Sequence, residues 1–250
     1  MAVSLLSLIP LLLIADNTLS LSPPPAAAPK SGSAFQWTSL CDSWRLTVET
    51  NNAGPWTTIP AQCKSSVVEY MSSKQYSSDS QAVTAAALAF AKQLSIGGDK
   101  KDVWVFDVDE TLLSNVPYYV KNGFRFDATS YNEWVNSAKS PALAAGLGLY
   151  RQLLEMGFAV VVVSGRSVAQ QNATERNLWQ AGYRKWEKLV LRGESEKNLS
   201  AAVYKSGKRK ALVGDGYRIQ GNSGDQWSDL LGAALANRSF KNPNPLYYLP

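Results

Sequence analysis

The chain has 250 residues, of which 45% are apolar and 18% charged, and its formal net charge is +5. These values are typical of a globular α/β protein, and the basic excess forms no arginine-rich stripe interleaved with aromatic residues, so we do not expect nucleic acid as a partner. Histidine is absent, which excludes every mechanism that needs imidazole as a base, a nucleophile or a metal ligand.

The first 22 residues contain an apolar core from Leu5 to Ala15, which is too short to span a bilayer and is typical of a signal peptide. We therefore predict a signal peptide at residues 1–22, with a buried helix as the alternative, and a flexible linker at residues 23–34. The protein is expected to be secreted or vacuolar. No later apolar run is long enough to place the mature chain in a membrane.

Cys41 and Cys63 are the only cysteines in the sequence. An even number of cysteines in a secreted chain predicts one disulfide between them, and two free buried thiols are the alternative. Three Asn-X-Ser/Thr sequons fit the same compartment and predict a glycoprotein. Their asparagines are Asn172, Asn198 and Asn237.

Residues 63–95 have the apolar spacing and alanine content of two helices, which would form an N-terminal helical extension before the main sheet. From residue 101 onward, short runs rich in β-branched residues alternate with helical segments. The runs read DVWVF, FAVVVVS, KLVLRG and YRIQGN, and each is nearly continuously apolar, as in strands covered on both faces. This order predicts a Rossmann-like parallel α/β sheet with helices on both faces, in which ligands bind at the carboxyl ends of the strands.

Two of the intervening helices have recognisable ends. Ser140 and Pro141 predict an N-cap and a first-turn proline for a helix that ends at Gly157. A second helix is predicted over residues 166–181, and Gly182 would end it. These signals place each helix between two strands, as right-handed crossovers require.

Acidic residues follow the DVWVF strand directly. Asp107 and Asp109 emerge at its carboxyl end, and side chains two residues apart on a strand point to the same side. This arrangement suits a division of labour in which Asp107 is the nucleophile and Asp109, held protonated by its surroundings, is the general acid and base. Thr111 would support the loop or donate a hydrogen bond. The alternative is a solvated turn in which Asp109 caps a helix that starts at Glu110.

The stretch DVDET, residues 107–111, resembles motif I of the haloacid dehalogenase-like phosphohydrolases, which is DxDxT after an apolar strand. FAVVVVSGR resembles motif II, whose hydroxyl, here Ser164, would bind a phosphate oxygen, unless Ser164 only caps the next helix. In YKSGKRK, Lys205 resembles the motif III lysine that offsets phosphoryl charge, with Lys208 as the runner-up. For most of this basic cluster a solvated helix face is the alternative.

The stretch GNSGDQWSD resembles motif IV, whose acidic residues hold a metal ion, although GDxxxD alone is often only a turn and an N-cap. Two carboxylates ~4 Å apart repel by roughly 4 kcal/mol at an effective dielectric of 20, so several converging carboxylates require a cation. Ligands that are all oxygen point to Mg²⁺. We expect Asp107, Asp225 and the carbonyl of Asp109 to hold it, with Asp229 in support.

Longer stretches resemble the plant acid phosphatases of class B, a group that includes the vegetative storage proteins. They read CDSWRLTVETNNAGPWTTIPAQC, VFDVDETLLSN, WEKLVLRG, YKSGKR and GDQWSDLLG. The resemblance covers residues 35–250, which would form one phosphatase domain with a small cap insert at about residues 117–141. Tyr118, Tyr119 and Trp134 of this insert would line the substrate mouth or, equally, form a satellite core.

The resemblance implies a Mg²⁺-dependent acid phosphatase that hydrolyses small phosphate monoesters through an aspartyl-phosphate intermediate. It also implies an alternative, a vegetative storage glycoprotein with little or no phosphatase activity. Storage members can lack the nucleophilic aspartate, which this chain retains as Asp107. A phosphotransferase would use the same intermediate with an alcohol as the acceptor. The oligomeric state is left open, with a homodimer or a heterodimer as candidates.

Overall fold

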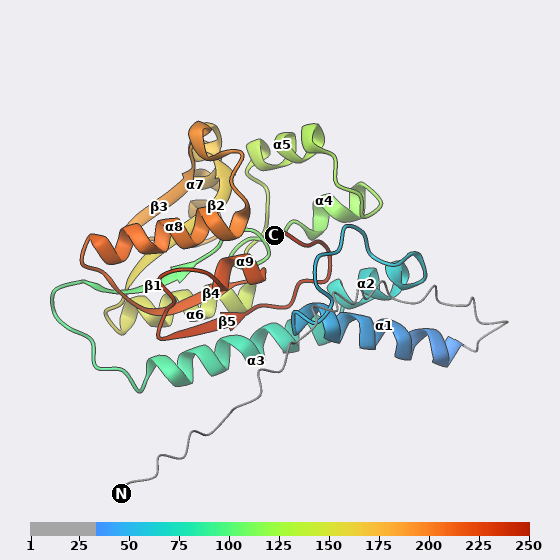
Figure 1. Ribbon diagram of the computed structural model, residues 1–250, viewed down its shortest axis with the longest axis horizontal. Helices are drawn as coiled ribbons and strands as arrows, with labels where there is room; N and C mark the ends of the chain where they lie inside the picture. Colours follow the sequence, from blue (N-terminus) through green and yellow to red (C-terminus); the bar gives the residue numbers. More distant parts are fainter. Residues whose placement is uncertain (1–33) are drawn as a thin grey trace, which may run out of the picture.

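The computed structural model describes residues 34–250; the predicted signal peptide and residues 23–33 of the predicted linker lie outside the described residues. Within this range, five parallel strands form one sheet in the order β3-β2-β1-β4-β5, with β1 at the centre (Figure 1). The strands are β1 (Asp102–Phe106), β2 (Ala159–Ser167), β3 (Lys188–Arg192), β4 (Arg218–Gly224) and β5 (Arg238–Lys241).

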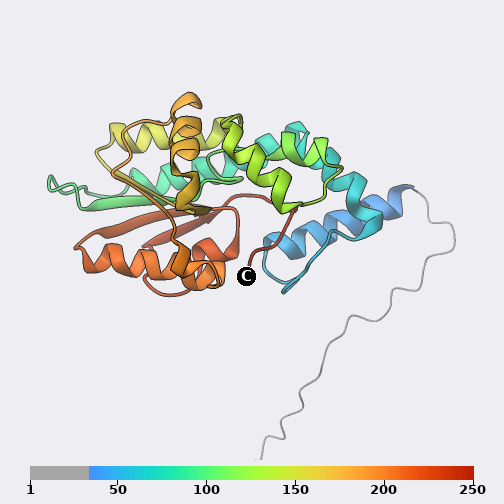
Figure 2. The same ribbon diagram turned by 90° about the horizontal axis from the view of Figure 1, so that it is seen from above.

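Helices cover both faces of this sheet, which confirms the predicted Rossmann-like α/β fold (Figure 2). They are α1 (Ala34–Glu49), α2 (Lys64–Met71), α3 (Lys74–Ala91), α4 (Val116–Lys121), α5 (Ala128–Ser137), α6 (Ala144–Glu155), α7 (Gln171–Gln180), α8 (Ala201–Gly214) and α9 (Trp227–Leu230). Helices α3, α6 and α7 lie on one face, and α8 and α9 lie on the other. No helix in residues 34–250 is both long enough and apolar enough to cross a membrane.

The central strand β1 supplies both hydrophobic cores, because its side chains alternate between the two faces. Trp104 and Phe106 pack into the core under α3 and α6, whereas Val103 and Val105 pack into the core under α8. All four side chains are buried. This is why the sequence of β1 is continuously apolar rather than alternating.

The indole of Trp104 is fitted closely between β1 and its neighbours. Its ring stacks on Phe240 with centroids 5.5 Å apart, and its N–H donates to Ser223 Oγ over 2.9 Å. Gly221 is its partner in β4, where a Cβ atom would lie 2.4 Å from the ring. The centre of the sheet therefore needs glycine at residue 221.

The predicted start of α6 is wrong. The helix begins at Ala144, because Ser140 does not cap it. Ser140 instead donates its backbone N–H to Asn177 Oδ1 and its hydroxyl to Asn115 Oδ1. These tertiary contacts hold Ser140 outside the helix, and neither Ser140 nor Pro141 belongs to a regular element.

The predicted start of α7 is also wrong. Strand β2 continues through an irregularity to Ser167, and a 3-10 turn at Val168–Gln170 follows before α7 begins at Gln171. The predicted ends are confirmed, since Gly157 and Gly182 follow the two helices with φ of +94° and +97°.

The helices predicted over residues 63–95 are confirmed as α2 and α3. Strand β5 was not predicted, so YRIQGN is not the last strand of the chain. At four residues, with a basic residue at each end, β5 lacks the continuous apolar run that marks the other strands.

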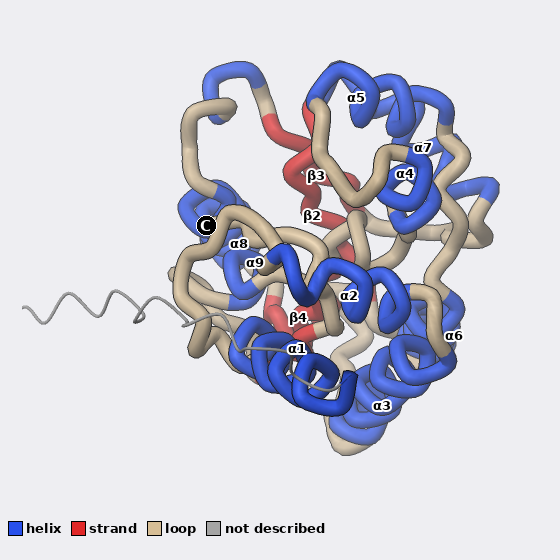
Figure 3. Tube along the Cα trace, turned by 90° about the vertical axis from the view of Figure 1, so that its right-hand side faces the viewer, coloured by secondary structure: helices blue, strands red, loops and turns tan. Residues whose placement is uncertain are grey.

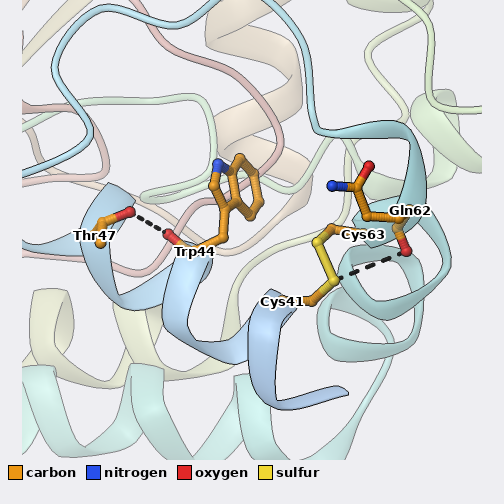
Figure 4. The surroundings of a disulfide bond; sticks show 5 residues. All are labelled: Cys41, Trp44, Thr47, Gln62 and Cys63. Carbon is orange, nitrogen blue, oxygen red and sulfur yellow. Dashed lines mark hydrogen bonds between the residues drawn. A yellow bond between two sulfur atoms is a disulfide. The ribbon is translucent and has the colours of Figure 1, made fainter. Parts of the chain in front are cut away.

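Cys41 and Cys63 form the predicted disulfide, so the alternative of two free thiols is wrong. Their Cα atoms are 5.2 Å apart, and both side chains are buried. The bond joins α1 to the 3-10 turn at Ala61–Cys63, as Figure 4 shows. Within the segment that it closes, Trp44 and Trp56 pack edge to face with centroids 5.3 Å apart. The N-terminal extension is thereby tied into one compact unit.

Helices α4 and α5 occupy the stretch predicted as the cap insert. They lie beyond the carboxyl ends of the strands, at the same end of the sheet as α1 and α2 (Figures 1 and 3). All three predicted cap aromatics, Tyr118, Tyr119 and Trp134, belong to a satellite core that they form with residues of α2 and of the C-terminal end of the chain. For Tyr118 and Trp134 the satellite-core alternative is therefore correct.

Replacing Gly221 by Ala should lower the free energy of unfolding by about 2 kcal/mol, because the added methyl group overlaps the Trp104 ring in a packed core. Urea unfolding followed by tryptophan fluorescence measures the change. Gly148→Ala is the control, since Gly148 is exposed in α6 with nothing near its Cβ position. That variant should be about 0.5–1 kcal/mol more stable, and equal stability of the two variants would contradict the packing argument.

Candidate active site

Three carboxylates from distant parts of the sequence meet at the carboxyl ends of the central strands. Asp107 follows β1, Asp225 follows β4, and Asp229 lies in α9. One oxygen of each lies within 4.8 Å of the others, and all three side chains are buried. The parallel sheet explains the meeting, because β1 and β4 are neighbours and end at the same edge.

Lys205 of α8 is the cation that the structure places in this cluster. Its Nζ donates to Oδ1 of Asp107 over 2.6 Å and also to Oδ1 of Asp229. Burial disfavours the ammonium, but the two carboxylates outweigh burial and raise the pKa of Lys205 above its ordinary value. Lys208, the runner-up, pairs instead with Glu196 near the surface. Of the two candidate lysines, Lys205 is therefore the one in contact with the carboxylate cluster.

Among the described residues, every hydrogen-bond partner of the Asp225 carboxylate is a neutral group. Its Oδ2 accepts from the amides of Gln226 over 2.8 Å and Asn244 over 2.7 Å. Its Oδ1 accepts from the Thr111 hydroxyl over 3.3 Å, the kind of contact predicted for Thr111. Burial and the charge of Asp229 raise the pKa of Asp225 to about 7.

Asp109 forms an ion pair with Arg166. The guanidinium donates to the carboxylate over 2.7 to 3.2 Å, and the Asn115 amide donates over 2.8 Å. Burial opposes ionisation, but the charge and hydrogen bonds of Arg166 lower the pKa of Asp109 below its ordinary value. The prediction that the surroundings hold Asp109 protonated is therefore wrong. The sequence analysis had placed Arg166 at the start of a helix.

Glu110 is a fully buried carboxyl for which the sequence predicted no role in the site beyond its place in the DVDET stretch. It accepts from the backbone N–H of Asn115 over 2.5 Å and from the Tyr247 hydroxyl over 2.6 Å. Burial, and then the charge of Asp109, raise the pKa of Glu110 to about 7. Its φ of +53° lies in the left-handed region. The alternative in which Asp109 caps a helix that starts at Glu110 is wrong, because a tight turn follows Asp109.

Ser164 does not line the pocket of the site. It is fully buried, and its Oγ accepts from the backbone N–H of Arg166 over 3.2 Å. Gly165 and Arg166, which follow it, reach the pocket surface. Ser164 does not cap a helix, because α7 begins only at Gln171.

Arg209 holds the loop that carries Asp229. It is almost fully buried, although the sequence analysis had favoured a solvated face for most of this basic cluster. Its guanidinium donates to the carbonyl of Asp229 over 2.5 Å and to carbonyls further along the loop. Those carbonyls belong to Leu231, Ala233 and Ala234.

A pocket of about 690 Å³ opens above these groups. Its polar floor includes Asp107, Asp109, Arg166, Lys205 and Asp225. Its aromatic wall consists of Tyr119, Phe126, Tyr131, Tyr247 and Tyr248. Of the three cap aromatics in the sequence prediction, only Tyr119 is among the pocket residues of the described chain. The pocket therefore has charged side chains on one side and aromatic rings on another.

The donor set fits a divalent cation. Among the described residues, Lys205 is the one ammonium in contact with this cluster, paired with Asp107 and Asp229 but not with Asp225, so the three ionised carboxylates would carry two negative charges in excess. Burial and the other carboxylates raise the pKa of Asp107, which shows that the ionised cluster is under-compensated. Carboxylate oxygens without histidine or free thiol suit a hard divalent cation. Asp107, Asp225 and the Asp109 carbonyl would hold the ion.

Several residues of the site were not predicted from the sequence, among them Arg166, Glu110, Asn244 and Tyr247. Arg166 had a usable signal, since it follows Ser164 of the motif II stretch by two residues. Glu110 had a weaker one, because it lies inside DVDET. Asn244 and Tyr247 had none: they lie after β5 in a segment without a motif, and the fold alone brings them to the site.

Comparison with known families gives one match across nearly the whole described chain. The family model for the HAD superfamily, subfamily IIIB (acid phosphatase), matches residues 30–250. Among curated proteins, acid phosphatase 1 of Solanum lycopersicum is 47% identical over 212 residues, which cover 84% of this chain and 83% of that protein. Vegetative storage protein 1 of Arabidopsis thaliana is 44% identical over 215 residues, with 84% and 79% covered.

The fold is shared with a solved phosphatase structure. The class C acid phosphatase of Bacillus anthracis superposes with a TM-score of 0.53, covering 85% of this chain and 87% of that one. The two sequences are 23% identical over this alignment. At that distance the likeness establishes the α/β fold.

Lys205→Met should lower the free energy of unfolding by about 3 kcal/mol at neutral pH, because it leaves two buried carboxylates without their cation. Lys208→Met is the control. Its partner, Glu196, is in contact with solvent, so the change should be below about 1 kcal/mol. Chemical denaturation of both variants distinguishes the two lysines, and a larger loss for Lys208→Met would reverse the assignment.

Proposed function

The chain belongs to the acid phosphatase subfamily IIIB of the HAD superfamily, and on this premise we propose that it is a Mg²⁺-dependent acid phosphatase. It would hydrolyse small phosphate monoesters through an aspartyl-phosphate intermediate. The observation that carries the proposal is the state of Asp107. Lys205 binds one carboxylate oxygen, the other accepts no hydrogen bond from a described residue, and the side chain lies on the pocket floor.

In the first step, the free oxygen of Asp107 attacks the phosphorus atom of the ester, and the bond from phosphorus to the alcohol oxygen breaks. Asp109 donates a proton to that leaving oxygen. Because Arg166 lowers the pKa of Asp109, this carboxyl carries the proton only at a more acidic pH than an ordinary aspartate would. This direction supports an enzyme that works under acidic conditions.

In the second step, water attacks the phosphoryl group, Asp109 accepts the proton of the water, and the bond between phosphorus and Asp107 breaks to release phosphate. Lys205 stays beside Asp107 and offsets charge on the transferred group. The backbone that follows Ser164 contributes to the pocket wall next to that group.

A bound Mg²⁺ would add Lewis-acid stabilisation of the phosphoryl oxygens. The residues that would hold it are Asp107, Asp225 and the carbonyl of Asp109, with Asp229 in support. Thr111 and Gln226 orient the Asp225 carboxylate, and Arg209 fixes the loop of Asp229.

A storage function is the second candidate, because relatives of similar identity carry storage or glycoprotein names. The stem 28 kDa glycoprotein of Glycine max is 45% identical over 214 residues. The complete set of Asp107, Asp109 and Lys205 in one pocket favours catalysis. The disulfide supports the further proposal that the protein is secreted or vacuolar, since such bonds persist in oxidising compartments.

Asp107→Asn should lower kcat for a chromogenic phosphate monoester by at least about a thousandfold, because the amide cannot serve as the nucleophile. The near-isosteric side chain still offers Lys205 an oxygen, so circular dichroism should show an intact fold. Asp215→Asn, which alters an exposed aspartate at the end of α8, is the control and should keep wild-type turnover. Hydrolysis by Asp107→Asn at the wild-type rate would contradict the mechanism.

Removal of divalent ions should abolish turnover, and Mg²⁺ should restore it, because the three clustered carboxylates need a cation to stay ionised together. The measurement is hydrolysis of a panel of phosphate monoesters by chelator-treated protein, with and without added Mg²⁺. Full activity after chelation would rule out metal dependence. A folded protein that stays inactive with every ester and with Mg²⁺ would favour the storage function.

A further inference from the structure

We propose that Glu49 and Asn244 are positioning residues for the metal site, through which the disulfide-closed N-terminal extension braces Asp225. The inference rests on the proposed function, since Asp225 is one of the expected Mg²⁺ ligands. The residues come from opposite ends of the described chain. Glu49 is the last residue of α1, and Asn244 lies in the segment after β5, which we call the C-terminal segment (residues 242–250).

The C-terminal segment acts on Asp225 directly. Asn244 is almost fully buried, and its side-chain amide donates to Asp225 Oδ2 over 2.7 Å. Gln226 donates to the same oxygen over 2.8 Å. Two amides on Oδ2 fix the rotation of the carboxylate and leave Oδ1 with a single long contact, from Thr111. Asn244 therefore helps to determine which oxygen Asp225 presents to the cluster.

Glu49 in turn fixes the backbone of Asn244. Its Oε1 accepts the backbone N–H of Asn244 over 2.8 Å. Its Oε2 accepts from Lys241 Nζ over 2.6 Å, which fastens the end of β5 to the same carboxylate. The Asn244 side-chain oxygen accepts the N–H of Leu246 over 2.9 Å, so the amide of Asn244 is held from both sides.

A disulfide and an aromatic contact restrain the segment that carries Glu49, residues 41–63. The disulfide from Cys41 closes the segment that contains Glu49, and Trp56 in this segment also meets Tyr248 of the C-terminal segment, with ring centroids 6.4 Å apart. Figures 1 and 2 show the C-terminal segment passing between the sheet and the N-terminal helices. Two contacts thus join the extension to the C-terminal segment, one polar and one aromatic.

Outer residues that orient a metal ligand change metal affinity when they are replaced, typically by 10- to 100-fold. A residue that only supports the fold would change stability and leave the affinity of the folded protein as it was. Metal affinity is therefore the quantity that distinguishes a positioning role from a structural one.

The test is titration of the full chain with Mn²⁺, with free Mn²⁺ followed by electron paramagnetic resonance, on variants shown to be folded by circular dichroism. Mn²⁺ is the probe because it accepts the same oxygen ligands as Mg²⁺. We expect Glu49→Ala to raise the Kd for Mn²⁺ about tenfold and Asn244→Ala to raise it about tenfold or more. Saturating metal should restore kcat in both variants, because the reacting groups are untouched.

The double variant tests the order of the relay. If Glu49 acts through Asn244, the Kd of Glu49→Ala/Asn244→Ala should equal that of Asn244→Ala within about twofold, whereas independent effects would multiply. Asp42→Ala is the matched control on the same helix, since Asp42 is exposed, and its Kd should be that of the wild type. A double-variant Kd raised by the product of the two single effects would overturn the inference that Glu49 acts through Asn244.

A second pair of variants keeps the test decisive if Glu49→Ala does not fold. Glu49→Gln keeps an oxygen for the Asn244 N–H and should keep the wild-type Kd, whereas Glu49→Asp withdraws the carboxylate by one methylene and should raise it. Equal Kd values for Glu49→Asp and the wild type would refute the inference. If the wild type itself binds no Mn²⁺, the proposed metal dependence fails, and the inference fails with it.

Discussion

Negative charge buried at the ends of the central strands is the constraint on which the site depends. Asp107, Asp225 and Asp229 approach one another in a buried position, and Lys205 is the ammonium that pairs with Asp107 and Asp229. Removal of such a cation leaves carboxylates that are neither solvated nor paired, which is far more costly than loss of a surface ion pair. The position of α8 on its face of the sheet is thus determined by the charge of Lys205 as well as by apolar packing.

Several features that look unrelated in the sequence serve this constraint. Arg209 is committed to backbone carbonyls around Asp229, and Asn222 donates to the carbonyl of Asp229 as well. Gly224 leaves room for the Asp229 side chain, since a Cβ there would lie 2.4 Å from it. Each of these contacts limits the movement of a carboxylate that its neighbours would otherwise repel.

Local patterns predicted four of the five strands of the parallel sheet, the two helices before it and the acidic residues after β1, because a buried strand followed by carboxylates is readable from sequence alone. The candidates Ser164, Lys205, Asp225 and Asp229 came from the resemblance to the phosphohydrolase motifs. They failed where tertiary contacts override local preference. Ser140 looks like an N-cap but binds Asn115 and Asn177 instead. Arg166 looks like the start of a helix but is drawn to Asp109 across the site. Asn244 could not be predicted, since only the completed fold brings it to Asp225.

The pairing of β1 sets the order in which this protein can fold. Asp102 pairs with Arg218, which is 116 residues later in the chain, so the innermost strand is the first to be synthesised and waits for one of its two neighbours until most of the chain has been translated. During that interval the run VWVF has an open hydrogen-bonding edge and an uncovered apolar face. A slowly collapsing, aggregation-prone nascent chain is the expected consequence, and the strand that leads into Asp107 and Asp109 is its most vulnerable part.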